Sequence, residues 1–153
     1  MKTTLIVGCF DPIHEGHIDH ILKAARLGDY LYVICHKDNM VTQKKGYCVQ
    51  PYDLRRQVIW GIMSLNSIKG TVLYAKEDDT GKYTDGIGQT IRALKPNIFA
   101  KGGDRVEGSL PQDEIDACKE VGCEIVYGIG DLLNSSSKMM EKARGEYSEN
   151  PSL

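Results

Sequence analysis

Two short clusters of residues in this sequence have the types and spacing needed to bind phosphate. The first lies between residues 8 and 17, after an apolar run and at the start of a helical pattern. Its members are Gly8, Cys9, Phe10, Asp11, His14, Gly16 and His17. Free main-chain N–H groups at the start of a helix bind anions. Imidazole donors strengthen such a site, and glycine lets a ligand approach the main chain closely.

The second cluster also stands at the start of a helical pattern and consists of Ser135, Ser136, Ser137 and Lys138. A helix N-cap needs only one hydroxyl, so three serines exceed what capping requires. A plain cap is the alternative for this cluster taken alone. Considered together, two helix N-termini at the carboxyl edge of one parallel sheet can face a single bound polyphosphate.

Basic and glycine-rich segments between the clusters could complete the site. Lys44 and Lys45 follow the second expected strand and can cover the phosphates, although most lysines in such segments are only solvated. Arg55, close to the start of the next helix, offers a fixed fork of donors. Gly102 and Asp104 follow the fourth strand, where the carboxylate can bind a ribose or a substrate hydroxyl. A simple tight turn is the alternative there.

The histidines also allow a metal-binding hypothesis. His14, His17 and His20 recur at intervals of three residues, a spacing that zinc sites use. Such sites usually add cysteine or carboxylate ligands in the right geometry. We therefore favour a phosphate site over a protein-bound metal, and Asp11 is the one side chain expected to help orient a metal ion.

Strand-like apolar segments alternate with segments of helical periodicity along the chain. The expected strands cover residues 3–7, 30–35, 71–75, 97–100 and 124–127. The expected helices cover 15–27, 51–65, 85–94, a segment opened by Pro111, and 138–144, and residues 36–50 are expected to form a loop. The helix over 51–65 is expected to bury one apolar face, formed by Leu54, Val58, Ile62 and Leu65.

This alternation predicts an α/β fold, a single doubly wound, Rossmann-like domain with a five-stranded parallel sheet. The domain is expected to span residues 1–144, with 145–153 as a flexible C-terminal tail. A length of 153 residues fits one domain. The net charge of −2 gives no overall positive potential of the kind that attracts nucleic acid. No apolar run approaches the roughly 18 residues of a membrane span, and no leader pattern precedes the first strand, so we expect a cytoplasmic protein.

The first cluster resembles the G-x-F-D…H-x-G-H signature of the cytidylyltransferase-like nucleotidyltransferases, reading Gly8-Cys9-Phe10-Asp11 and His14-Glu15-Gly16-His17. The second resembles the serine- and threonine-rich signature of that family, reading Ser135-Ser136-Ser137-Lys138. The resemblance covers most of residues 4–140. Within the family, the sequence is similar to heptose 1-phosphate adenylyltransferases and to glycerol-3-phosphate cytidylyltransferases. The latter carry an arginine shortly before the second signature, whereas residues 128–133 contain no basic residue.

The resemblance implies transfer of a nucleoside monophosphate from ATP or CTP to a small phosphorylated acceptor, such as a sugar or polyol phosphate, with release of pyrophosphate. His14, His17 and Lys45 would be catalytic, with the histidines acting on the α-phosphate. Mg²⁺ would accompany the nucleotide, and a homodimer is consistent with the family. The remaining expected nucleotide- or phosphate-binding residues are Gly8, Cys9, Phe10, Asp11, Gly16, Lys44, Arg55, Gly102, Asp104, Ser135, Ser136, Ser137 and Lys138.

Two other functions can be weighed against this one. Class I aminoacyl-tRNA synthetases carry a similar pair of signatures, but 153 residues leave no room for a tRNA-binding domain and no basic patch is present. A non-catalytic nucleotide-binding protein of the same fold is the other alternative. Because both histidines, the lysines and the serines of the expected site are all present, the sequence favours an enzyme.

Overall fold

A five-stranded, all-parallel sheet forms the centre of the protein, in the order β3-β2-β1-β4-β5. The computed structural model describes residues 1–103, 105–131 and 136–149. Its strands are β1 Thr3–Gly8, β2 Tyr30–Cys35, β3 Gly70–Leu73, β4 Ile98–Ala100 and β5 Glu124–Val126. These bounds confirm the five expected strands to within a few residues. The strand order reverses between β1 and β4, which creates a crevice at the carboxyl ends of those strands.

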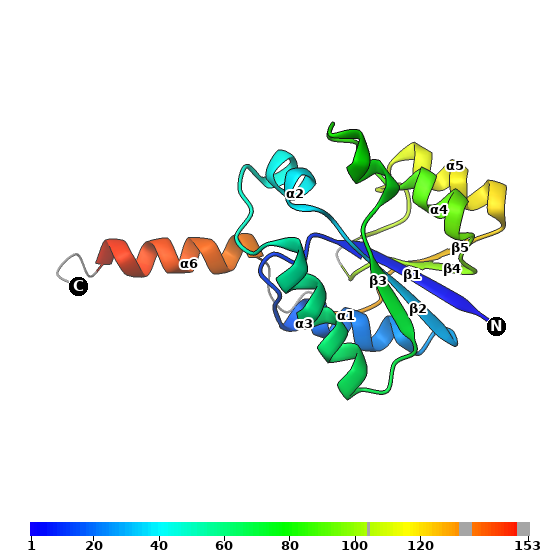
Figure 1. Cartoon of the computed structure of the whole chain (residues 1–153), viewed down its shortest axis with the longest axis horizontal. Helices are drawn as coiled ribbons and strands as arrows, with labels where there is room; N and C mark the ends of the chain where they lie inside the picture. Colours follow the sequence, from blue (N-terminus) through cyan, green and yellow to red (C-terminus); the bar gives the residue numbers. More distant parts are fainter. Residues whose placement is uncertain (104, 132–135, 150–153) are drawn as a thin grey trace.

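Helices cover both faces of this sheet (Figure 1). They are α1 Glu15–Ala25, α2 Asp38–Lys45, α3 Tyr52–Leu65, the 3₁₀ helix η1 Lys76–Thr80, α4 Gly88–Leu94, α5 Gln112–Val121 and α6 Ser136–Glu149. Figure 1 shows α1 and α3 together on one face, α4 and α5 on the other, and α6 extending away from the sheet. The doubly wound α/β fold expected from the sequence is therefore confirmed.

Two buried clusters, one on each face, explain why the strands read as continuous apolar runs. In β1, Ile6 faces α1 and α3 while its neighbour Leu5 faces α4 and α5. Val33 and Ile34 of β2 divide in the same way. Because successive side chains of a strand point to opposite faces, a strand covered by helices on both sides needs apolar residues throughout.

Residues 36–50 were expected to form a loop but contain helix α2. Asp38 lies in its first turn, Lys44 and Lys45 in its last turn, and Gly46 ends it with φ of 87°. Acidic residues near the start, basic residues near the end and a left-handed glycine after it are typical helix-end signals. The helix has only two buried residues, Met40 and Val41, so it lacks the apolar stripe by which helices are recognised.

The buried face of α3 also differs from the expected one. The helix buries Arg55, Ile59 and Met63, whereas Leu54, Val58 and Leu65 are exposed. Of the expected face only Ile62 packs against the core, and the buried residues lie one position after the expected ones. An arginine in the buried face, held there by hydrogen bonds, cannot be anticipated from a hydrophobic pattern.

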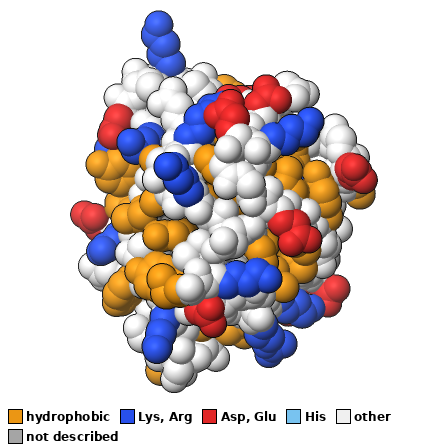
Figure 2. Space-filling model, turned by 90° about the vertical axis from the view of Figure 1, so that its right-hand side faces the viewer, with side chains coloured by type: hydrophobic (Ala, Val, Ile, Leu, Met, Phe, Trp, Pro, Cys, Tyr) orange, Lys and Arg blue, Asp and Glu red, His pale blue; other side chains and the backbone are white. Residues whose placement is uncertain are grey.

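The face at the amino ends of the strands carries hydrophobic, basic and acidic side chains intermixed, as Figure 2 shows. Helix α6 continues to Glu149 instead of ending near residue 144. Among the described parts of the chain, no helix combines the length and apolar character that crossing a membrane requires.

Candidate active site

A cleft of about 360 Å³ opens at the carboxyl ends of β1, β2 and β4, where the strand order reverses. Parallel sheets bind ligands at this position. Several expected site residues line the cleft together: Gly8, Cys9, Phe10, His14, Gly16, His17, Lys44, Lys45 and Gly102. The structure thus brings the first cluster without Asp11, the two lysines and the first glycine after β4 into one site.

His14 and His17 form the N-terminal cap of α1. The Nδ1 atom of His14 accepts a hydrogen bond from the Gly16 N–H at 3.1 Å, and Nδ1 of His17 accepts one from the His14 N–H at 3.2 Å. A main-chain N–H can only donate, so neither Nδ1 carries a proton. In each neutral ring the proton therefore sits on Nε2. The rings stack with centroids 3.7 Å apart.

Both histidines are held in the neutral form. Burial lowers the pKa of His17 to about 3, and the positive charge of Lys45 acts in the same direction, as would a proton on the stacked His14 ring. Burial also lowers the pKa of His14, again with Lys45 contributing. At neutral pH the site therefore offers two uncharged N–H donors fixed by the helix cap, with the positive charge supplied by lysines.

Lys44 and Lys45 reach the cleft from the last turn of α2. The Nζ atom of Lys45 donates to the main-chain oxygen of Asp11 at 3.2 Å, which holds the ammonium beside the histidines. These lysines were expected in a loop, and α2 instead presents them from a helix end. The expectation that they cover a bound phosphate stays a prediction.

Asp11 has a structural role instead of the expected one. Its side chain is buried, and its two carboxylate oxygens accept the N–H groups of Val49 and Gln50 at 2.6 and 2.7 Å. These bonds fix the connection between α2 and α3. A carboxylate occupied in this way does not face the cleft, which contradicts the expectation that Asp11 orients a metal ion or a substrate phosphate.

Arg55 was expected to bind phosphate, yet its side chain is fully buried. Its guanidinium donates to the main-chain oxygens of Cys9 and His36 at 2.7 Å and of Gln50 at 2.8 Å. It also pairs with the Asp38 carboxylate at 2.7 Å. Arg55 therefore ties the ends of β1 and β2 to α2 and α3, and this geometry contradicts direct phosphate contact.

The glycines after β4 serve two different purposes. Gly102 lines the cleft. Gly103 packs so closely on the 128–131 segment that a Cβ there would lie 2.2 Å from the Gly130 oxygen. That segment is fixed in turn by hydrogen bonds to Lys101 and to the ring of His20. Close main-chain packing is a sufficient reason for glycine at position 103.

The second cluster is only partly visible in the structure. Ser136 and Ser137 form the start of α6, and Lys138 is exposed on the same helix. Ser135 and Asp104 lie outside the described residues, so the expectations for them stay predictions. The helix start expected at this point of the sequence is present.

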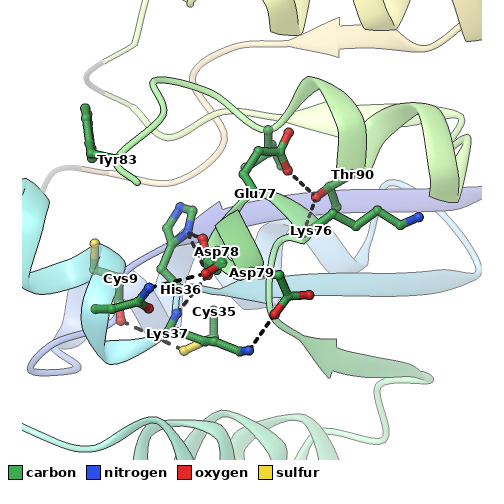
Figure 3. Close-up of polar contacts among 12 residues, drawn as sticks. Cys9, Cys35, His36, Lys37, Lys76, Glu77, Asp78, Asp79, Tyr83 and Thr90 are labelled. Atoms are coloured by element: carbon green, nitrogen blue, oxygen red, sulfur yellow. Dashed lines mark hydrogen bonds and ion pairs between the residues drawn. The ribbon is translucent and has the colours of Figure 1, made fainter. Parts of the chain in front are cut away.

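Sequence reasoning missed His36, which lies directly after β2 and lines the cleft. Its ring contacts Asp78 of η1, as Figure 3 shows. Glu114 of α5 was also missed: it is buried at the cleft wall, and burial raises its pKa. The position of His36 at the carboxyl end of a strand next to β1 was a usable signal, whereas nothing local marks Asp78 or Glu114.

The described residues contain no group of three histidine, cysteine, aspartate or glutamate side chains arranged to hold a metal ion. The Nδ1 atoms of His14 and His17 are already occupied by main-chain donors. Burial raises the pKa of the Cys9 thiol, so it stays protonated at the cleft floor. The histidine and lysine side of the cleft thus offers neutral and positive donors suited to anions, while Asp85, Glu114 and Asp131 also line the cleft.

Comparison with solved structures supports the fold. The lipopolysaccharide core biosynthesis protein from Thermoplasma volcanium superposes with a TM-score of 0.64 at 22% identity, covering 86% of this chain and 98% of that chain. Pantoate-beta-alanine ligase from Francisella tularensis gives a TM-score of 0.51 at 15% identity, covering 82% of this chain and 58% of that chain. At these identities the likeness shows a shared fold.

Comparison of sequences identifies closer relatives. The bifunctional protein HldE of Hahella chejuensis is 33% identical over 153 residues, covering 94% of this chain and 28% of that protein. The bifunctional protein HldE of Gluconobacter oxydans is 33% identical over 138 residues, covering 89% of this chain and 26% of that protein. This chain therefore spans about a quarter of the length of these relatives.

The family model described as cytidylyltransferase-like matches residues 5–145, a range that includes the whole cleft and both clusters. The two histidines at the start of α1 and the start of α6 both lie within this matched range. The chain belongs to the cytidylyltransferase-like family of nucleotidyltransferases.

Proposed function

We propose that this protein transfers a nucleoside monophosphate from ATP or CTP to a small phosphorylated acceptor, such as a sugar or polyol phosphate, and releases pyrophosphate. One observation carries the proposal: two neutral Nε2–H donors at the start of α1 and two lysines at the end of α2 line the same cleft. Family membership and the HldE relatives support the same reaction class.

The proposed reaction needs little acid–base chemistry. An oxygen of the acceptor phosphate forms a new bond to the α-phosphorus, and the bond from that phosphorus to the oxygen bridging to the β-phosphate breaks. The electron pair leaves with pyrophosphate. Because a phosphate monoester has a second pKa of about 6, the nucleophile is already a dianion at neutral pH. Catalysis then consists of positioning and charge stabilisation.

His14 and His17 supply the charge stabilisation in this proposal. Negative charge grows on the non-bridging oxygens of the α-phosphate as the five-coordinate state forms. Donors fixed in advance by the α1 cap can meet that charge without rearranging. Their neutral state avoids strong attraction to the triphosphate before the reaction, so their effect is concentrated in the transition state.

The lysines and the α6 start complete the nucleotide site in this proposal. Lys45, beside the histidines, is the catalytic cation, and Lys44 covers the phosphates. The β- and γ-phosphates lie toward Ser135, Ser136, Ser137 and Lys138, where a helix N-terminus favours anions. Mg²⁺ enters as part of the nucleotide substrate. The ribose or acceptor contact of Asp104 is part of the same proposal.

The cytoplasmic location and the homodimer also belong to this proposal. Apolar side chains exposed on α3 and on the edge strand β3 support self-association, namely Leu54, Val58, Trp60 and Leu73. Sedimentation equilibrium of the purified chain tests the proposed homodimer. A dimer is expected, and a monomer at high micromolar concentration would contradict the homodimer.

A pyrophosphate-release screen tests the reaction. ATP and CTP are each combined with Mg²⁺ and a panel of sugar 1-phosphates and polyol phosphates, with the corresponding unphosphorylated sugars and polyols as matched controls. Pyrophosphate is expected only with a phosphorylated acceptor, together with a product whose mass equals acceptor plus nucleoside monophosphate. Nucleotide binding without pyrophosphate release for any pair would indicate a non-catalytic nucleotide-binding protein instead.

A further inference from the structure

His36, one of the four histidines that line the cleft, has the opposite hydrogen-bonding direction from His14 and His17. Its Nδ1 atom contacts both carboxylate oxygens of Asp78, at 2.9 and 3.2 Å (Figure 3). A carboxylate only accepts hydrogen bonds, so Nδ1 of His36 carries the proton. A neutral ring in this orientation presents a lone pair at Nε2. Within this cleft, His14 and His17 are thus set as donors and His36 as an acceptor, while the Nδ1 atom of the remaining histidine, His20, contacts the Ile129 oxygen.

Asp78 is fixed firmly enough to impose this state. Its side chain is fully buried, and Oδ2 also accepts the Lys37 N–H at 2.8 Å. Its main-chain oxygen accepts the side-chain amide of Asn39 at 3.3 Å. A carboxylate held by η1, the end of β2 and α2 cannot turn away from the ring. The orientation of the imidazole is therefore set before any ligand binds.

The main chain of His36 is anchored as well. Its N–H donates to the Gly8 oxygen at 3.1 Å, and its own oxygen accepts from Arg55 at 2.7 Å. Within the described chain no residue forms a hydrogen bond with Nε2. The side chain is 12% exposed and lines the cleft, as does Tyr83.

We propose that Nε2 of His36 accepts a hydrogen bond from a hydroxyl group of the phosphorylated acceptor. A lone pair repels phosphate oxygens and attracts an O–H group, so His36 does not duplicate the phosphate contacts of α1 and α2. It selects acceptors that carry a hydroxyl close to the phosphate, which means polyol or sugar phosphates over simple alkyl phosphates. This inference rests on the proposed function.

The location of His36 agrees with an acceptor contact. It follows β2, whereas Gly102 and Gly103 follow β4, on the other side of β1. A nucleotide at the β1–β4 crevice leaves the β2 side of the cleft for the second substrate. Sites that hydrogen-bond a substrate hydroxyl strongly reject analogues without it, because the protein group is left unpaired.

Asp78 is a positioning residue for His36. Asp78→Asn reverses the direction of the hydrogen bond between residue 78 and Nδ1 of His36, while the side chain keeps its shape. The Lys37 N–H still requires an acceptor, so the amide oxygen faces it. The amide NH₂ then donates to Nδ1 of His36, and the ring proton moves to Nε2. The acceptor becomes a donor. Asp79→Asn is the matched control, because this neighbouring carboxylate is exposed and pairs with the Lys37 ammonium at 2.7 Å.

Nitrogen-15 NMR of the histidine rings tests the inference without catalysis. At pH 7.5 the wild-type protein is expected to show His36 protonated on Nδ1 only, with His14 and His17 protonated on Nε2 only. Asp78→Asn should move the His36 proton to Nε2, and Asp79→Asn should not. A wild-type His36 that is protonated on Nε2, alone or on both nitrogens, overturns the inference.

Kinetics with two acceptors test its consequence. Glycerol 3-phosphate and propyl phosphate differ only in their hydroxyl groups, and the wild type is expected to favour the former by about tenfold or more in kcat/KM. Asp78→Asn and His36→Phe should reduce that preference to less than about threefold while KM for the nucleotide changes less than about twofold. A preference unchanged in both variants overturns the inference.

The inference remains testable if no acceptor supports pyrophosphate release. That result contradicts the proposed function alone. The ring signals of His36 are then followed while glycerol 3-phosphate or propyl phosphate is added to the wild-type protein. A response to glycerol 3-phosphate that exceeds the response to propyl phosphate supports the hydroxyl contact. An equal response, or no response to either compound, overturns it.

Discussion

Replacing Arg55 by methionine separates a structural arginine from a phosphate-binding one. The side chain is fully buried, and its guanidinium donates to the main-chain oxygens of Cys9, His36 and Gln50 at 2.7, 2.7 and 2.8 Å. Methionine keeps much of the apolar stem but offers no donor. Arg55→Met therefore leaves three carbonyl groups at the base of the cleft without their partner.

The size of the effect follows from those three carbonyls. A buried polar group left without its hydrogen bond costs about 1–3 kcal/mol. Water entering from the cleft can satisfy part of the set, so the expected loss in unfolding free energy is about 3–5 kcal/mol, below the simple sum. That is a large share of the roughly 5–15 kcal/mol that stabilises a typical domain.

Urea unfolding followed by circular dichroism measures this loss. Arg56→Met is the matched control, because the exposed Arg56 side chain makes only weak contacts within the described residues, a hydrogen bond to the Val72 oxygen at 3.5 Å and a position over the Trp60 ring 5.9 Å from its centroid. The control is expected to change the unfolding free energy by less than about 1 kcal/mol. If Arg55 bound phosphate instead, Arg55→Met would unfold like the wild type and lose nucleotide affinity. That combination would refute the structural role.

Two further predictions concern the loops and histidines of the site. Asp11→Asn leaves an amide NH₂ facing the N–H of Val49 or Gln50, so the unfolding free energy should fall by about 1–3 kcal/mol. Limited proteolysis should also cut the connection between α2 and α3 sooner than in the wild type. An unchanged midpoint of urea unfolding would contradict the structural role of Asp11. Below pH 6.5, the usual pKa of histidine, the unfolded chain protonates His17 while the folded chain, with a pKa of about 3, does not. Stability should therefore decrease as pH falls from about 6.5 toward 3, by about 2 kcal/mol at pH 5 from this residue, and His17→Gln should reduce that decrease in urea titrations at pH 7.5 and 5. Equal losses in both proteins would show that burial does not hold His17 neutral.

Much of the fold could be predicted because both faces of the sheet are covered. Strands buried on two sides require continuous apolar runs, such as residues 30–35, and these stand out in the sequence. Helix α2 could not be predicted in the same way, since a helix with two buried residues shows no apolar stripe. Its signals lay only at its ends, in Asp38 and Gly46.

The site was predictable where function requires a local pattern. His14 and His17 cap α1 and line the cleft, and their spacing alone placed them there. Asp11 and Arg55 stood in the right region but bond to distant main-chain groups, which sequence spacing does not reveal. His36 depends on Asp78, 42 residues away, so its role became visible only in the folded chain.

The account rests most heavily on His17 as a donor to the α-phosphate in the transition state. The most direct test is the single-turnover rate of nucleotidyl transfer by His17→Ala, measured with the nucleotide Kd and with circular dichroism to verify folding. The rate should fall by about 10²–10³-fold while Kd changes by less than about threefold. Transfer at the wild-type rate by a folded His17→Ala variant would contradict the account.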